Sequence, residues 1–281
     1  MKKVLTEKII CLGLIFSLIA FHSGAQRTKS VFKEDEKIKL AILMYHGFSS
    51  GKRESTYVID EKSLEDDIIY LKENGFSFIS CADLVDYIDY NKPLPEKCVM
   101  LTFDDGYYNN YLYAYPVIKK HGVKATLSPI ASCSDENSLS SDSNPAYSHM
   151  TWEQIREVSD SGLFEIQNHS YDMHSLNNGR KGSAKAFAET GKDYRYIFFK
   201  DLLNAHTAIK NATGKAPYAY AYPFGSVSYE TRAILKCFGY RISFGCEEGI
   251  NYITRDKDSL YMLKRFNRSN EKNAQMLLDG Y

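Results

Sequence analysis

The chain has 281 residues, of which 44% are hydrophobic and 25% are charged, enough for one large domain with a full hydrophobic core. Its 35 lysines and arginines balance its 35 aspartates and glutamates, so the formal net charge is zero. Proteins whose main partner is nucleic acid usually carry an excess of positive charge, so this balance argues against that class.

The N-terminal residues 1–25 have the pattern of an export signal. Lysines precede an apolar run over residues 9–21, and small residues in HSGAQ fit cleavage after Ala25. The run is shorter than the roughly 20 residues that a membrane span needs. An uncleaved anchor is the alternative, and it would be the only part of the chain in contact with a membrane. We therefore expect a secreted or extracytoplasmic protein, attached to the membrane or the cell wall if the anchor is kept.

Residues 26–37 are polar and charged and are expected to form a linker. From residue 38 to residue 281, segments typical of strands alternate with segments typical of helices, which predicts one domain. The expected strands cover 40–48, 76–80, 98–103, 123–131, 163–170, 218–225, 240–245 and 260–269. The expected helices cover 61–75, 81–90, 109–122, 151–162, most of 182–214, and 228–239. Pro116 is expected to kink the third helix, and the polar segment 132–149 is expected to be a loop.

Strands that alternate with helices indicate parallel βαβ units, and therefore an α/β fold. About seven strands in one domain fit either a barrel or an open doubly wound sheet. Both architectures place functional residues at the carboxyl ends of the strands. Polar residues stand at several of these ends, namely His46, Asp104, Asp105, His169 and the turn 222–225.

Two adjacent aspartates, Asp104 and Asp105, follow a buried strand in the segment TFDDG. Neighbouring carboxylates repel each other, so we expect a cation to neutralise one of them. His169 and His174 stand at the end of another strand and could supply neutral imidazoles. Two imidazoles and one carboxylate form a three-ligand site for a divalent metal, with positions left open for water and substrate. The remaining aspartate could then accept a proton from that water.

The segments LTFDDGY, NHSYDMH and YAYPFG, in this order, resemble the polysaccharide deacetylase family, also called the NodB homology domain or carbohydrate esterase family 4. The resemblance extends from about residue 42 to residue 265. The spacing of five between His169 and His174, and the pair Tyr45–His46, resemble the exported poly-N-acetylglucosamine deacetylases. The resemblance implies a distorted (β/α) barrel of about seven parallel strands. It also implies hydrolysis of N-acetyl groups on an extracellular or cell-wall polysaccharide that contains N-acetylglucosamine.

The family motifs imply a role for each matching residue. Asp104 would be the general base, and Asp105, His169 and His174 would hold the metal, which we expect to be zinc, with cobalt or nickel as alternatives. The backbone N–H of Phe224 would stabilise the oxyanion. Pro223 would shape that turn, and Ser170 would support the histidine loop. Two further candidates come from the residues themselves. One of Tyr107 and Tyr108, of which we favour Tyr107, would line the cleft, and the late-strand Arg265 would line the site.

Two departures from the family pattern concern the reaction itself. The motif arginine that orients the base falls on Ala221, and the late histidine that usually acts as the acid is absent. We therefore hypothesise that His46 is the acid or a substrate contact, with a structural strand-end histidine as the alternative. His149 is a weaker candidate for the acid. Trp152, the only tryptophan, is expected to pack in the core rather than to stack on a sugar.

Two other functions stay open on the sequence alone. The missing arginine and histidine suggest a non-catalytic carbohydrate-binding protein on the same fold. An amide hydrolase that acts on a substrate other than a sugar would need the same metal and base. The intact base and the three metal ligands favour the deacetylase over the binding protein.

Overall fold

The computed structural model describes residues 37–51, 55–140 and 142–281. The expected signal segment, and all of the expected linker except Lys37, lie outside these residues. Within the described part of the chain, none of the helices has the length and apolar character that a membrane span requires. The fold below is that of the domain that begins at Asp35.

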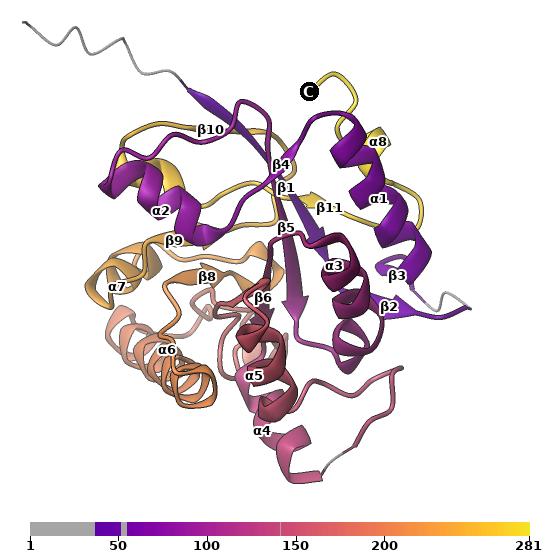
Figure 1. Ribbon diagram of the computed structural model, residues 1–281. Coiled ribbons are helices and arrows are strands. Elements are labelled where there is room, and N and C mark those ends of the chain that lie inside the picture. The colour runs from indigo at the N-terminus through magenta and orange to yellow at the C-terminus, as the bar shows by residue number, and fades with distance from the viewer. Residues whose placement is uncertain (1–36, 52–54, 141) are drawn as a thin grey trace, which may run out of the picture. The chain divides into compact units, whose positions relative to one another are not determined.

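A mostly parallel sheet organises the domain (Figure 1). Its central strands are β1 (Ile38–Tyr45), β5 (Cys98–Asp105), β6 (Ala125–Pro129) and β7 (Phe164–Ile166), each parallel to the next. Parallel neighbours also join from β4 (Ser77–Phe78) and β11 (Phe266–Asn267), whereas β10 (Asn251–Ile253) runs antiparallel to β1. Two further parallel pairs are β2 (Gly47–Ser49) with β3 (Val58–Asp60), and β8 (Ala219–Ala221) with β9 (Ile242–Phe244).

The mostly parallel α/β fold is confirmed, but the expected barrel is wrong, because the described strands do not close into one. A single bridge, Asn168 to Tyr220, links the segment after β7 to β8. A second single bridge, Phe244 to Leu263, links the end of β9 to the segment before β11. Since β8 and β9 have only three residues each, the hydrogen-bonded ladder breaks on both sides of them. The antiparallel β10 is a second departure from the expected parallel barrel.

The helices follow the expected order, with two corrections and one short additional helix near the C-terminus. They are α1 (Glu61–Glu73), α2 (Cys81–Asp89), α3 (Tyr115–His121), α4 (Ala131–Ser140), α5 (Trp152–Asp160), α6 (Gly191–Thr213), α7 (Thr231–Cys237) and α8 (Ala274–Leu277). Pro116 is the second residue of α3 and comes directly after the π-helical turn Asn110–Ala114, so the helical hydrogen-bond pattern changes just before the proline, and the kink stays a prediction. The expected loop 132–149 starts as α4. The helix expected from residue 182 begins only at Gly191, where Thr190 caps it.

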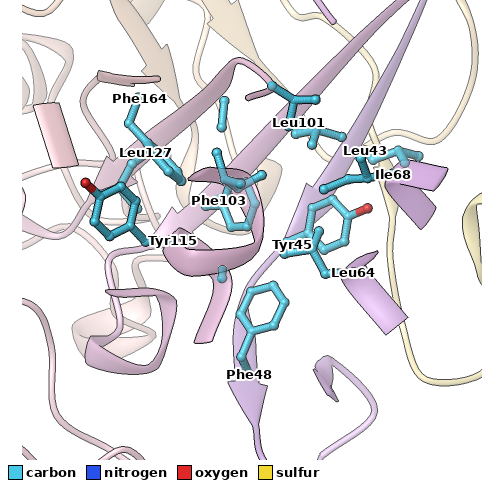
Figure 2. Packing of buried hydrophobic residues seen from close by; sticks show 14 of the residues in the cluster. Leu43, Tyr45, Phe48, Leu64, Ile68, Leu101, Phe103, Tyr115, Leu127 and Phe164 are labelled. Atoms are coloured by element: carbon cyan, nitrogen blue, oxygen red, sulfur yellow. The ribbon is translucent and has the colours of Figure 1, made fainter. Parts of the chain in front are cut away.

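The apolar side chains of β1 and β5 point alternately to the two faces of the sheet, and both faces are buried. Leu43, Tyr45, Leu101 and Phe103 pack against α1 and α3 on one face (Figure 2). The residues between them, such as Ile42 and Met100, pack against α2 and the β8–β9 pair on the other face. Because successive side chains of a strand point to opposite faces, two buried faces produce the continuous apolar run seen in the sequence.

A buried ion pair ties the C-terminal segment to α1. The Asp67 carboxylate, 3% exposed, accepts hydrogen bonds from Arg268 Nε at 2.5 Å, the Ala274 N–H at 2.9 Å and the Tyr45 hydroxyl at 3.1 Å. Burial raises the pKa of Asp67 in spite of the charge on Arg268. This pair holds the chain immediately after Arg265 in place.

We expect Asp67→Ala to lower the free energy of unfolding by about 3–5 kcal/mol, because it leaves a buried guanidinium without its partner. Equilibrium unfolding in urea measures this loss. Asp66→Ala is the matched control, since Asp66 pairs with Lys62 at 2.8 Å on the exposed side of the same helix and should change stability little. A loss in Asp67→Ala that is no larger than in the control would contradict the role of the pair.

Candidate active site

The two aspartates at the end of β5 are separated by a sharp change in the backbone. Asp104 continues the extended strand, whereas Asp105 has a φ of +67° and Gly106 a φ of +73°. A Cβ on Gly106 would lie 2.7 Å from the Cβ of Pro129, so this turn requires glycine. The left-handed conformation of Asp105 is uncommon for a residue with a side chain and is typical of functional sites. The turn directs the two carboxylates to different partners.

Arg265 is the partner of Asp104. Its Nη1 and Nη2 donate to the two carboxylate oxygens at 2.8 and 2.7 Å, and its Nε donates to the carbonyl of Gly245 at 2.8 Å. Both side chains are buried, with Arg265 0% exposed. Burial alone would raise the pKa of Asp104, but the positive charge of Arg265 lowers it below its ordinary value. The family arginine is missing because its position is Ala221. The guanidinium that pairs with Asp104 comes instead from Arg265, directly before β11.

Asp105 faces the two histidines. Its Oδ1 lies 3.3 Å from Nε2 of His169 and 3.4 Å from Nε2 of His174. The three potential ligand atoms lie within 4.8 Å of one another. The buried Oδ1 has no hydrogen-bond partner among the described residues. Although burial raises the pKa of Asp105, its interactions with His169 lower it well below the ordinary value. The structure thus brings together the three residues that the sequence predicts as metal ligands.

The orientation of His169 is fixed by the residue that stands where the family has its arginine. Nδ1 of His169 donates to the carbonyl oxygen of Ala221 at 2.8 Å, which leaves Nε2 toward Asp105. Metal-binding histidines usually donate their second ring nitrogen to such an acceptor. Ala221 thus contributes its backbone where the family arginine would contribute a side chain.

The loop between the two histidines is held by buried polar groups. Ser170 has a φ of +95°, its N–H donates to Asn168 Oδ1 at 2.7 Å, and its hydroxyl accepts from the N–H of Met173. The Asp201 carboxylate on α6 accepts from the N–H groups of Tyr171 and Asp172 at 2.9 and 2.7 Å. These contacts agree with the supporting role expected of Ser170. We did not predict Asp201 from the sequence.

The turn at Pro223 and Phe224 lies against the histidines. Phe224 has a φ of +56°, and its ring centroid is 4.3 Å from that of His174. A Cβ on Gly225 would lie 2.8 Å from the Cβ of Cys246, so the chain can pass this point only with glycine. Phe224 is 38% exposed, which places its ring at the surface beside the predicted metal ligands.

Two more candidate residues, His46 and Tyr107, interact with Asp105, whereas Trp152 lies elsewhere on the domain. The Nδ1 atom of His46, just after β1, is buried without a hydrogen-bond partner among the described residues, and burial lowers the pKa of this histidine. Tyr107 stacks on His149 at 4.8 Å, and burial together with the charge of Asp105 raises the pKa of Tyr107 to about 12. Trp152 is half-buried and donates to Asp135 at 2.7 Å, so it packs against the core but is not fully enclosed. The catalytic role of His46 and the place of Tyr107 in the cleft stay predictions.

The polysaccharide deacetylase family model matches residues 91–243, more than half of the chain. The chain belongs to the polysaccharide deacetylase family. The resemblance expected from the TFDDG segment and the histidine pair is therefore confirmed, and the family is one of enzymes. The matched range contains both aspartates, both histidines and the turn at Phe224. It ends before Arg265, which explains why the partner of Asp104 does not stand out as a motif.

Bacterial members of the family are similar to the chain. The YxkH protein of Bacillus subtilis (strain 168), which is assigned to the polysaccharide deacetylases, is 29% identical over 85% of this chain and 74% of its own length. The poly-beta-1,6-N-acetyl-D-glucosamine N-deacetylase of Escherichia coli (strain K12) is 27% identical over 67% of this chain, a match that spans 31% of the E. coli protein. The solved structure of a de-N-acetylase from Aggregatibacter actinomycetemcomitans shares the fold, with a TM-score of 0.73 and 24% identity over 85% of this chain and 98% of that one.

The support that Asp201 gives to the histidine loop should depend on pH. Burial raises the pKa of Asp201 to about 6, above its ordinary value of 3.8. Between these values the folded state binds more protons than the unfolded state, so the contribution of Asp201 to stability falls as pH rises. We expect the difference in unfolding free energy between wild type and Asp201→Asn to fall by about 2 kcal/mol from pH 4 to pH 7, in urea titrations at each pH. A difference that grows with pH would contradict this.

Proposed function

We propose that this deacetylase-family protein is a metal-dependent hydrolase that removes N-acetyl groups from an N-acetylglucosamine-containing polysaccharide. The observation that carries the proposal is the position of two buried charged groups side by side at the end of β5. One is the Asp104–Arg265 pair, and the other is the cluster of Asp105, His169 and His174. A general base next to a three-ligand metal site is the arrangement that hydrolysis of an amide needs.

The cluster fits a divalent cation. A buried carboxylate oxygen without a hydrogen bond, 3.3 and 3.4 Å from two imidazole nitrogens, is an acceptor that a cation would satisfy. Two imidazoles and a carboxylate suit zinc, and also cobalt or nickel, and they leave coordination positions open. Asp105, His169 and His174 would hold the ion, which when bound supplies Lewis-acid polarisation of the acetyl carbonyl and activation of water.

Asp104 is the general base. The guanidinium of Arg265 occupies both of its carboxylate oxygens, lowers the pKa of the acid and fixes the plane of the carboxylate. An ionised carboxylate in one orientation is prepared to accept the proton of the attacking water. The Phe224 N–H donates to the oxyanion that develops on the acetyl carbonyl oxygen, and Pro223 sets the direction of that turn. Tyr107 lines the sugar cleft next to Asp105.

The leaving amine must gain a proton, and the chain lacks the late histidine that supplies one in the family pattern. His46 is the residue that we assign to this step or to a hydrogen bond with the sugar. Its buried Nδ1 has no partner among the described residues, so a bound substrate would satisfy an otherwise unpaired group. His46 also lies on the strand next to β5, at the end where Asp104 and Asp105 stand.

The polymer that we favour is poly-β-1,6-N-acetylglucosamine. The E. coli relative is named for this substrate. Peptidoglycan and chitin-like oligomers carry the same acetamido group and are the alternatives. The export signal expected at residues 1–25 fits a polymer outside the cytoplasmic membrane. The alternative of a non-catalytic binding protein rested on the missing motif arginine and the missing late histidine. The first reason no longer holds, because Arg265 supplies the positive charge beside Asp104 that Ala221 does not.

Acetate release tests the proposal. Residues 32–281 loaded with zinc should release acetate from β-1,6-linked N-acetylglucosamine oligomers, and Asp104→Asn should lower kcat by at least about 100-fold while zinc content stays the same. Asp105→Asn is the matched comparison, because it should lower both acetate release and the zinc content measured by atomic absorption. No release by the wild type from β-1,6 or β-1,4 oligomers or peptidoglycan fragments, with zinc bound, would overturn the proposal.

His46→Ala should retain zinc and lower kcat about 10²–10⁴-fold if the imidazole is the acid. If it only holds the sugar, KM should rise while kcat changes less. Wild-type values of both constants, measured on the same oligomers, would leave His46 with a structural role only.

A further inference from the structure

A groove with a volume of about 720 Å³ lies between helices that pack against one another. These are α5 and α6, with α4 beside both (Figure 1). The volume is within the range of about 300–1,000 Å³ that is usual for sites that bind small organic molecules. Its lining includes aromatic, amide, hydroxyl and charged side chains, and none of the predicted metal ligands. The groove is therefore a separate surface feature with mixed chemistry.

Two aromatic side chains in the groove lining, Trp152 and Tyr171, are held in place by the same carboxylate. Trp152 Nε1 and the Tyr171 hydroxyl donate to the two carboxylate oxygens of Asp135, at 2.7 and 2.8 Å. All three residues are only half-buried. Because one carboxylate holds both rings, they keep their orientation without a bound ligand. Preorganised aromatic surfaces of this kind, apolar on the face and polar at the edge, suit a ligand with both characters.

Helix α6 contributes a row of polar side chains to the groove lining. Asn204, Thr207 and Asn211 follow one another at helical spacing, so they line the same face. None of these three side chains makes a hydrogen bond to any other described residue. Leu203, 41% exposed, adds an apolar surface beside them. The amide and hydroxyl groups can both donate and accept, which matches the hydroxyl and acetamido groups of a sugar.

The charges that line the groove favour a neutral ligand. They consist of one carboxylate, Asp135, and one guanidinium, Arg156, whose Nε donates to the carbonyl of Ala212 at 2.6 Å. Both oxygens of Asp135 are already used by ring donors. A polyanion such as nucleic acid would need an excess of positive charge, which the groove does not supply.

The groove connects to the predicted active site through the histidine loop. Tyr171 lies in the loop between His169 and His174, and its backbone N–H donates to Asp201 of α6. Its side chain reaches Asp135 in the groove lining. A polymer that fills the groove would therefore contact the same loop that carries the two predicted metal ligands.

We propose that the groove between α5 and α6 is a second saccharide site, which binds an uncharged N-acetylhexosamine stretch of the polymer while another unit occupies the metal centre. The choice of ligand rests on the proposed function. Trp152 and Tyr171 contact the apolar faces of the sugar rings, and Asn204, Thr207 and Asn211 hydrogen-bond to the hydroxyl and acetamido groups.

Thr207→Arg tests the site, because a long side chain in the middle of the groove fills it without touching the metal centre. Ile197→Arg is the matched control on the same helix, an exposed position outside the groove lining. Binding of metal-loaded wild type and variants to poly-β-1,6-N-acetylglucosamine is measured by the retardation of each protein in native gels that contain the polymer. We expect Thr207→Arg to weaken binding at least about 5-fold and Ile197→Arg to change it little.

Kinetics provide the second readout. Thr207→Arg should raise KM for the polymer at least about 5-fold, and leave kcat and KM for a single N-acetylglucosamine unit at wild-type values, because one unit cannot occupy both sites. Trp152→Phe, which removes the donor to Asp135 but keeps an aromatic ring, should weaken polymer binding less. Thermal unfolding checks that each variant is folded.

Polymer retardation that is equal in Thr207→Arg and wild type would overturn the inference, as would a wild type that the polymer does not retard. The two proposals can fail separately. If the polymer retards the protein through the groove but no acetate is released, the deacetylase proposal is wrong and the saccharide site stands. If acetate is released but Thr207→Arg leaves kcat and KM for the polymer unchanged, the deacetylase proposal stands and the saccharide site is wrong.

Discussion

The site depends on how two adjacent buried carboxylates are accommodated at the end of one strand. Asp104 and Asp105 are 1% and 4% exposed, and burial disfavours the charge on each. The chain gives each carboxylate its own source of positive charge. Arg265 forms a two-pronged pair with Asp104, and two imidazoles face Asp105. The left-handed turn at Asp105 makes this separation possible, because it directs the second carboxylate away from the first.

The rest of the domain holds these partners in position. Arg265 comes from the C-terminal part of the chain, and the buried pair of Asp67 with Arg268 fixes the segment that follows it. Asn168 accepts a hydrogen bond from the start of the histidine loop, and Asp201 on α6 accepts two more from it. Of the five non-glycine residues with positive φ in the described chain, three are Asp105, Ser170 and Phe224. Local strain is therefore concentrated in the three motifs of the site.

Local patterns predicted the parts of the fold that depend on neighbours in sequence. The continuous apolar runs of β1 and β5, and the Thr151 cap of α5, were predictable because strand burial and helix capping act over a few residues. The prediction was wrong where tertiary contacts decide. Polar residues 131–140 form a helix that packs against α5 and α6, and the barrel does not close because β8 and β9 are too short. Asp201 was missed, although an acidic residue at a buried position of α6 is a detectable signal.

The sequence by itself determined which reactive residue types meet at the site. Adjacent aspartates after an apolar strand, and a histidine pair after another, are short segments whose residue types predict a base and metal ligands. Only the tertiary structure decided which residue neutralises Asp104, because Arg265 lies 161 positions away along the chain and one arginine among many carries no local signal. The same holds for the groove, whose lining comes from α4, α5, α6 and the histidine loop. Contacts between distant segments depend on how the whole chain packs, which no short stretch of sequence encodes.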